Sequence, residues 1–237
     1  MAKKRLDAFL SNEKIGSRKD VKKRIQSGSV TVNDEVIKKI DYKVSSDDVI
    51  LVDGIRVIPL GMVYYMLNKP KDVVSANVDN MHKTARDLII DYKKDDLFSI
   101  GRLDIDTTGL LLFTNDGLLS HRLRSPGYAI PKTYEVTFEG TFKDSFIEDF
   151  KRGITLDDGY QCLSSELEYI ESNKAKLTIK EGKFHQVKRM FRAVSLDVVS
   201  LKRISFGDIA LDMSLSEGEY RMLSDEEVLK LKQSVNI

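Results

Sequence analysis

Two aspartates in a short polar turn are the residues of this sequence whose types and spacing could do chemistry. Asp104 and Asp106 stand two residues apart in the stretch IGRLDIDTTGLLLFTNDG, which covers residues 100–117. Three interpretations are open. The polar residues can be turn formers that hydrogen-bond their own backbone. The two carboxylates can bind Mg²⁺ or act as an acid/base pair, or one carboxylate can act as nucleophile or base between Arg102 and a more distant cation. Spacing alone favours the turn formers.

The segments on either side predict how this turn is held. Residues 98–101 and 110–113 are predicted strands, and the Asn-Asp-Gly run at 115–117 is expected to end the second strand and cap a helix that stops before Pro126. Because side chains alternate along an extended chain, we expect the two carboxylates on one side and Ile105 in the core.

Composition limits the class of protein to which the turn can belong. With 237 residues, of which 41% are hydrophobic, the chain can bury a sizeable core. Its single cysteine, Cys162, excludes an internal disulfide framework and makes a reducing, cytoplasmic location the default. No apolar run approaches the roughly 20 residues of a membrane helix, and no secretory leader is recognisable. We find no phosphate-binding glycine loop and no metal-ligand spacing, so we expect neither a cofactor nor a metal.

The front of the chain is its basic part. Residues 1–60 contain 13 Lys+Arg and 9 Asp+Glu, a net charge of +4. Ser17 is placed to cap a helix whose inner face is Val21 and Ile25, with Gly28 just past its end. The outer face carries Arg18, Lys19, Lys22, Lys23 and Arg24. Clustered cations of this kind suit a polyanion, although a merely solvated helix face is an equal alternative on charge alone.

The stretch SRKDVKKRIQSGSVTVNDEV, residues 17–36, followed by short predicted strands, resembles the S4 RNA-binding domain. The resemblance implies that the basic helix and its adjoining loop bind structured RNA by recognising its shape and contacting its phosphates.

Four further segments carry a resemblance that extends over essentially the whole chain. They are GRLDIDTTGLLLFTNDG, KTYEVT at 132–137, EGKFHQVKRMFRAV at 181–194 and LDMSLSEGEYRML at 211–223. In this order the chain resembles the RsuA-type pseudouridine synthases, S4-bearing enzymes that isomerise uridine in ribosomal RNA. The resemblance implies an α+β protein with an S4-like domain over residues 1–60. A catalytic domain over residues 61–237 would be built on a mainly antiparallel sheet flanked by helices.

Site roles follow from the same resemblance. Asp104 is implied as the catalytic nucleophile or base, Arg102 as a residue that holds the flipped nucleotide, and Tyr134 as the aromatic against the uracil ring. Lys188 is implied as the cation that pairs with the aspartate, with a shift of one position to Arg189 left open. Leu201 is a candidate wall of the uracil pocket, and LNKP at 67–70 matches the opening strand of the catalytic domain. Helical spacing over residues 184–194 places Arg189 and Arg192 on the polar face of a predicted helix, where we expect them to form a basic edge of the active site that binds RNA. By spacing alone, Tyr134 is an ordinary core aromatic and His185 an oriented structural histidine.

The implied reaction fits the absence of cofactor motifs, because moving a glycosidic bond from nitrogen to carbon needs neither redox chemistry nor phosphate energy. Attack at C1′, proton removal at C2′ and addition to C6 of uracil all stay open. The expected partner is 16S rRNA, free or in a partly assembled small subunit, with uridine 516 as the target, and the protein is expected to be a monomer. The alternatives are a large-subunit (23S) enzyme, a non-catalytic rRNA-binding assembly protein and a Mg²⁺-dependent hydrolase.

Overall fold

The computed structural model describes residues 4–13, 15–45, 48–57, 61–90 and 96–237. The chain divides into two compact units, Met1–Gly61 and Met62–Ile237. Residues 58–60, at the predicted domain boundary, lie outside the described residues. No helix in the described ranges is long and apolar enough to cross a membrane.

The first unit packs two helices against short strands. Its elements are β1 (Lys4–Arg5), α1 (Leu6–Asn12), α2 (Arg18–Ser27), β2 (Val30–Val32), β3 (Glu35–Val36), β4 (Lys43–Val44), β5 (Ile50–Val52) and β6 (Ile55–Val57). Strands β3, β2, β5 and β6 form an antiparallel sheet in that order. Ser17 forms a capping box with Asp20, and Gly28 ends α2 in the left-handed conformation, as predicted. Val21 and Ile25 are fully buried.

The second unit is built on one long sheet with the order β11-β12-β10-β13-β9-β7-β15. Its strands are β7 (Tyr64–Lys69), β8 (Phe98–Ile100), β9 (Thr108–Thr114), β10 (Lys132–Glu139), β11 (Glu166–Tyr169), β12 (Lys174–Ile179), β13 (Asp197–Phe206), β14 (Ile209–Ala210) and β15 (Tyr220–Met222). The pairings are antiparallel except for β13 with β9. The α+β class with a mainly antiparallel sheet is therefore confirmed.

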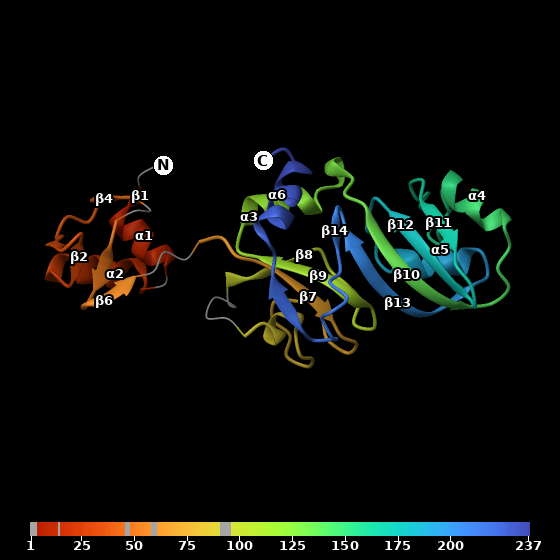
Figure 1. Ribbon diagram of the computed structural model, residues 1–237, viewed down its shortest axis with the longest axis horizontal. Coiled ribbons are helices and arrows are strands. Elements are labelled where there is room, and N and C mark those ends of the chain that lie inside the picture. The colour runs from red at the N-terminus through yellow and green to blue at the C-terminus, as the bar shows by residue number, and fades with distance from the viewer. Residues whose placement is uncertain (1–3, 14, 46–47, 58–60, 91–95) are drawn as a thin grey trace. The chain divides into compact units, whose positions relative to one another are not determined.

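Helices cover this sheet at both ends. They are α3 (Gly117–Arg124), α4 (Ser145–Arg152), α5 (Gln186–Ala193) and α6 (Asp225–Gln233), with short 3₁₀ turns η1 (Ala85–Leu88) and η3 (Pro126–Tyr128). Figure 1 shows α3 and α6 together at one end and α4 and α5 at the other. Side chains that alternate along β9 contribute to two hydrophobic cores. Leu110 and Leu112 pack in the core that includes residues of α3 and α6, whereas Leu111 and Phe113 pack in the core that includes residues of α4 and α5.

A glycine permits the parallel junction at the centre of the sheet. Gly109 pairs with Arg203 of β13 and has φ +95°. A Cβ added there would lie 2.3 Å from the Arg203 carbonyl oxygen, so no other residue fits without moving the backbone. The junction directly follows the turn that carries the two aspartates, and it fixes where that turn begins and ends.

Candidate active site

The Asp104 turn is a tight backbone turn and not an extended segment. The Thr107 amide donates to the Asp104 carbonyl oxygen at 3.1 Å, which leaves Ile105 and Asp106 at the tip. The prediction that Ile105 points into the core is therefore wrong, since this side chain is 37% exposed. Leu103 and Thr107 are the buried residues, because the turn breaks the alternation on which the prediction relied.

A buried lysine holds this turn from below. Lys69, the third residue of LNKP, is 0% exposed, and its Nζ donates to the carbonyl oxygens of Thr107 at 2.8 Å, Pro70 at 2.9 Å and Ile105 at 3.3 Å. Burial lowers the pKa of Lys69 to about 8, while the charges of Asp106 and Asp104 oppose that shift. The ammonium thus satisfies carbonyl groups that the turn cannot pair internally.

Three further hydrogen bonds fix the turn to the segment after β7. The Asp72 amide donates to the Ile105 carbonyl oxygen at 2.9 Å. The Ser75 hydroxyl donates to the Leu103 carbonyl oxygen at 2.8 Å and accepts from the Leu103 amide at 3.0 Å. The backbone on both sides of Asp104 is thereby anchored, which is the support that a catalytic carboxylate needs to keep its position.

Lys188 lies against both carboxylates. Its Nζ donates to Asp106 Oδ1 at 2.5 Å and lies 3.6 Å from Asp104 Oδ2. Burial raises the pKa of Asp106, but the hydrogen bond and charge of Lys188 outweigh that effect, so the net pKa lies below its ordinary value. The structure therefore makes Asp106 part of the charge network around Asp104.

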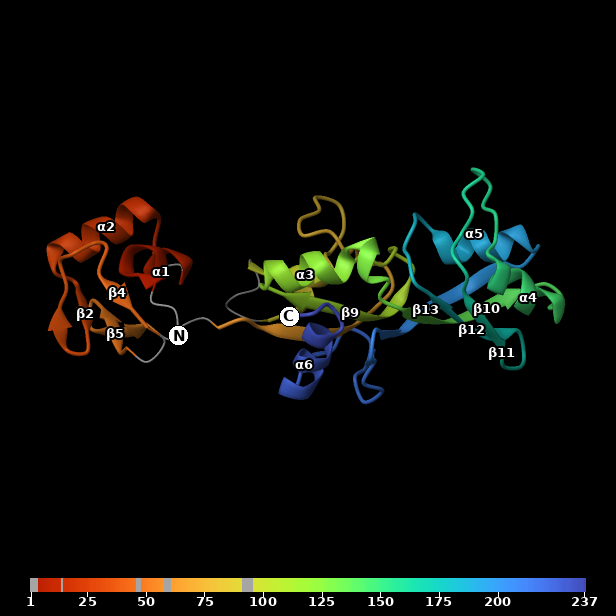
Figure 2. The same cartoon turned by 90° about the horizontal axis from the view of Figure 1, so that it is seen from above.

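Arg189 is held by other acids. Its side chain is only 16% exposed, and its guanidinium pairs with Asp157 and Asp158, which belong to the connection between α4 and β11. Figure 2 shows that connection rising beside α5. Of the two neighbours between which the sequence left a choice, Lys188 reaches Asp104 and Asp106, and Arg189 faces a different pair of carboxylates.

Tyr134 and Leu201 lie in one core cluster together with Leu103, the residue before Asp104. Tyr134 is 7% exposed and Leu201 6%. Next to the turn is a pocket of about 290 Å³. It is lined by Lys71, Asp106, Thr108, Glu135, Ser200, Leu201, Lys202 and Glu217. Leu201 therefore lines this pocket, whereas Tyr134 is not among the lining residues.

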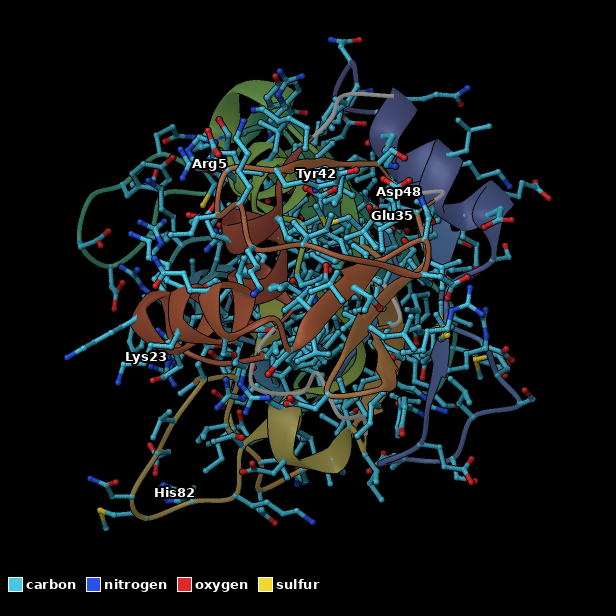
Figure 3. All side chains as sticks on the ribbon, turned by 90° about the vertical axis from the view of Figure 1, so that its left-hand side faces the viewer. Arg5, Lys23, Glu35, Tyr42, Asp48 and His82 are labelled. Atoms are coloured by element: carbon cyan, nitrogen blue, oxygen red, sulfur yellow. The ribbon has the colours of Figure 1, made fainter. Side chains whose placement is uncertain are left out.

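The remaining predicted cations are exposed. Arg102 and Arg192 are exposed in the second unit, and Arg18, Lys19, Lys22, Lys23 and Arg24 are exposed on α2 in the first. Figure 3 shows Lys23 projecting outward from its helix. In the described parts of the chain, no group of three or more His, Cys, Asp or Glu side chains is arranged to hold a metal ion.

His185 differs from the structural histidine that its position suggested. Its side chain is 41% exposed, its φ is +48°, and its Nε2 lies 3.7 Å from Asp104 Oδ1. Its ring stacks on that of Phe184. Sequence reasoning also missed Lys69, for which the signal was a lysine at the end of an apolar strand, and Phe184, for which no pattern gave a signal.

Two family models match the chain in the regions where the two units lie. Residues 63–193 match RNA pseudouridylate synthase, and residues 4–50 match the S4 domain. The chain is 40% identical to an RNA pseudouridine synthase of Bacillus subtilis, YtzG, over 97% of this chain and 98% of that protein.

Relatives with a more specific name are equally similar. The ribosomal small subunit pseudouridine synthase A of Vibrio cholerae is 41% identical, with 96% of this chain and 99% of that protein covered. The protein of the same name from Escherichia coli is 39% identical over 94% and 98%. A crystal structure of a pseudouridylate synthase superposes with a TM-score of 0.70 at 38% identity, covering 96% of this chain and 99% of that one.

Proposed function

The chain belongs to the RNA pseudouridylate synthase family and contains an S4 domain, and from this premise we propose that it isomerises a uridine of ribosomal RNA to pseudouridine with Asp104 as the catalytic residue. The observation that carries the proposal is a carboxylate on an anchored turn with the Lys188 ammonium 3.6 Å away. We assign residues 1–60 to RNA binding and residues 61–237 to catalysis.

The reaction has requirements that these groups can meet. The bond between N1 of uracil and C1′ of the ribose breaks, a bond between C5 and C1′ forms, and the proton on C5 is lost while N1 gains one, so atoms and electrons balance without a co-reactant. An anionic oxygen beside the ribose can act as nucleophile or base and can stabilise positive charge on the sugar. The ammonium of Lys188 compensates the negative charge of Asp104 and Asp106. Arg102, which is exposed and lies two residues before Asp104, can bind a phosphate of the RNA.

The target uridine must leave the RNA stack to reach Asp104. Tyr134 is positioned in the cluster beneath the turn, and we assign it to the face of the uracil, with Leu201 as an apolar wall. Extruding a base is costly, and an aromatic surface that replaces its lost stacking offsets that cost.

We assign the substrate to 16S rRNA, with uridine 516 as the specific target. The names of the Vibrio and Escherichia relatives support the small subunit. A large-subunit target is the alternative, and it is separated by mapping pseudouridines in 16S and 23S rRNA from a strain that lacks this protein. Loss of a carbodiimide-dependent primer-extension stop from 23S rRNA would contradict the substrate assignment.

The catalytic assignment is tested with Asp104→Asn, which keeps the size of the side chain and removes its charge. This variant should bind 16S rRNA like the wild type and form no pseudouridine. Asp149→Asn, an exposed acid on α4, is the matched control and should be fully active. Retained activity in Asp104→Asn would refute the mechanism. Activity that disappears with EDTA, together with strong impairment of Asp106→Ala, would favour a Mg²⁺-dependent reaction instead.

A further inference from the structure

Phe184 presents an aromatic face to solvent beside the candidate active site. Its side chain is 76% exposed, and its ring stacks on the His185 ring with centroids 3.8 Å apart and an interplanar angle of 19°. The Nε2 atom of His185 in turn lies 3.7 Å from Asp104 Oδ1. One face of the Phe184 ring is thus covered by His185, while the residue as a whole remains largely open.

Exposure alone would mean little, because single apolar side chains on a surface are common. The loop that carries Phe184 is, however, held firmly. Gln186 is 3% exposed, its Oε1 accepts from the Lys183 amide at 2.8 Å, and its Nε2 donates to Glu181 Oε1 at 2.8 Å. These bonds fix the chain on both sides of Phe184.

The backbone at the next residue has an uncommon conformation. His185 adopts φ +48°, a left-handed conformation that is uncommon for a residue other than glycine. His185 is the residue just before α5. Val187, Met190 and Phe191 of that helix are buried, whereas Phe184, which precedes the helix, is exposed. A held loop with an uncommon backbone conformation that directs a phenylalanine outward indicates a function for the exposed ring.

We infer that Phe184 is a stacking platform for a base that neighbours the target uridine in the RNA, an inference that rests on the proposed function. Proteins recognise unpaired bases by stacking them on aromatic rings, and flipping one nucleotide out of a stack leaves its neighbours without a partner. The reacting base itself belongs at Asp104. The His185 ring stands between that carboxylate and Phe184, so a base on Phe184 is an adjacent one. Phe184 is accordingly a positioning residue.

The expected kinetic result separates binding from chemistry. Phe184→Ala should raise the Kd for 16S rRNA and the KM for pseudouridine formation about tenfold, the size of effect seen when an aromatic that stacks on one base is removed. The kcat at saturating RNA should stay within about twofold. Phe184→Tyr should restore wild-type values because it keeps the flat ring, whereas Phe184→Leu should behave like Phe184→Ala because it keeps only apolar character.

A direct measurement is possible because the chain contains no tryptophan. Phe184→Trp in an Asp104→Asn background supplies a single tryptophan, which can be excited apart from the tyrosines, in a protein that is expected to bind RNA without turning it over. Addition of 16S rRNA should quench its fluorescence, as stacking on a base does. Leu118→Trp in the same background is the control, since Leu118 is 55% exposed on α3, at the other end of the sheet from α5 (Figure 1), and should respond little.

The outcomes distinguish this inference from the function on which it rests. If the wild type forms pseudouridine but Phe184→Trp is not quenched and Phe184→Ala binds with wild-type Kd, the stacking role is refuted and the proposed function stands. If no pseudouridine forms on any rRNA but Phe184→Trp is quenched by RNA and Leu118→Trp is not, the platform is supported and the catalytic proposal fails. A fall in kcat alone for Phe184→Ala would also refute the inference, since it would place the effect in the chemical step.

Discussion

Helices α2 and α5 are both basic in sequence, yet their cations are used in different ways. On α2, the four side chains of Arg18, Lys19, Lys22 and Lys23 are exposed, and within the described part of the chain only Arg24 of this helix has an ion pair, with Asp53. On α5, Lys188 lies against Asp104 and Asp106, and Arg189 pairs with Asp157 and Asp158.

This difference indicates two functions for positive charge. An exposed cation can neutralise a phosphate and release its counterion, so it contributes affinity that falls with salt. A cation already paired with a carboxylate contributes little binding free energy toward a phosphate, because its existing ion pair would have to break first. Its contribution is to orient the acid. We therefore assign RNA affinity to α2 and site geometry to Lys188 and Arg189.

Replacing Lys188 should have the largest effect. Lys188→Met removes the cation that lies against both aspartates and leaves two neighbouring carboxylates of one turn with less positive charge beside them. We expect kcat for pseudouridine formation to fall about 100-fold or more, the range found when one preorganised electrostatic partner is removed. Single-turnover rates at saturating 16S rRNA measure this decrease.

The binding constant is the control for this prediction. Lys188→Met should bind 16S rRNA within a few-fold of the wild type, because Lys188 is already occupied by the protein's own acids. Lys188→Arg, which retains the charge with a different donor geometry, should recover part of the rate. If Lys188→Met bound 16S rRNA more weakly but kept the wild-type kcat, Lys188 would act in RNA binding as the α2 cations do. The proposed difference in function between α2 and α5 would then be wrong.

Arg189 tests the same comparison on the neighbouring cation. Arg189→Gln should release the connection between α4 and β11 that carries Asp157 and Asp158, and we expect kcat/KM to fall by less than tenfold, because the ion pair of Lys188 with Asp104 is left in place. Amide hydrogen exchange in residues 153–165 should rise. The double variant Asp157→Asn with Asp158→Asn should reproduce both changes, while an unchanged exchange pattern in either variant would contradict the structural role of this pair.

The sequence predicted features that depend on residues close together in the chain. The Ser17 cap of α2, the Gly28 that ends the same helix and the Asp116 cap of α3 all follow from patterns within one or two helical turns. The order of family motifs then identified the fold and implied Asp104, because whole-chain motif order carries information that local patterns do not.

The features that could not be predicted depend on distant residues. Lys188 and Asp106 are 82 positions apart, Lys69 and Thr107 are 38 apart, and Arg189 and Asp157 are 32 apart. These contacts arise only once β7 pairs with β9, β9 pairs with β13 and α5 packs on the sheet. The exposure of Ile105 was mispredicted for the same reason, since the turn is held by Lys69 of β7 and Ser75 of the following segment in addition to its own hydrogen bond between Thr107 and Asp104.

Lys132 extends the comparison to a partly buried cation that makes no ion pair with any carboxylate among the residues that the structure describes. Its Nζ donates to the Ile130 carbonyl oxygen at 2.9 Å and lies over the Phe206 ring. Burial, with a smaller contribution from the charge of Arg203, lowers the pKa of Lys132 to about 8, and Glu181 opposes that shift. Because folding disfavours the charged form, the cost to stability is fully present below pH 8 and is relieved as the pH rises toward 10.5.

The stability of Lys132→Met against pH measures this cost. The free energy of unfolding of the wild type relative to this variant should rise by about 1–2 kcal/mol between about pH 7 and pH 10.5, a range that allows for solvent screening of a partly exposed ammonium. Urea titrations at about pH 7, 8.5 and 10.5 provide the values. A difference that does not change with pH would mean that Lys132 is solvated as freely as the cations of α2.

The smallest effect is expected from single substitutions on α2, and it appears mainly in the salt dependence. Lys22→Gln or Lys23→Gln should weaken binding of 16S rRNA only a few-fold near about 0.1 M salt and leave kcat unchanged. The slope of log Kobs against log salt should become smaller in magnitude by about 0.7–0.9 for each phosphate that is no longer neutralised. Arg24→Gln is the matched control on the same helix, since Arg24 is already paired with Asp53 and should change the slope less. Filter binding across a salt series gives these slopes. An equal change of slope for Arg24→Gln would show that the ion pair of Arg24 with Asp53 opens when RNA binds. The two helices would then differ in how deeply their ion pairs are buried. The side chains of Lys188 and Arg189 on α5 are 21% and 16% exposed, whereas that of Arg24 is 44% exposed.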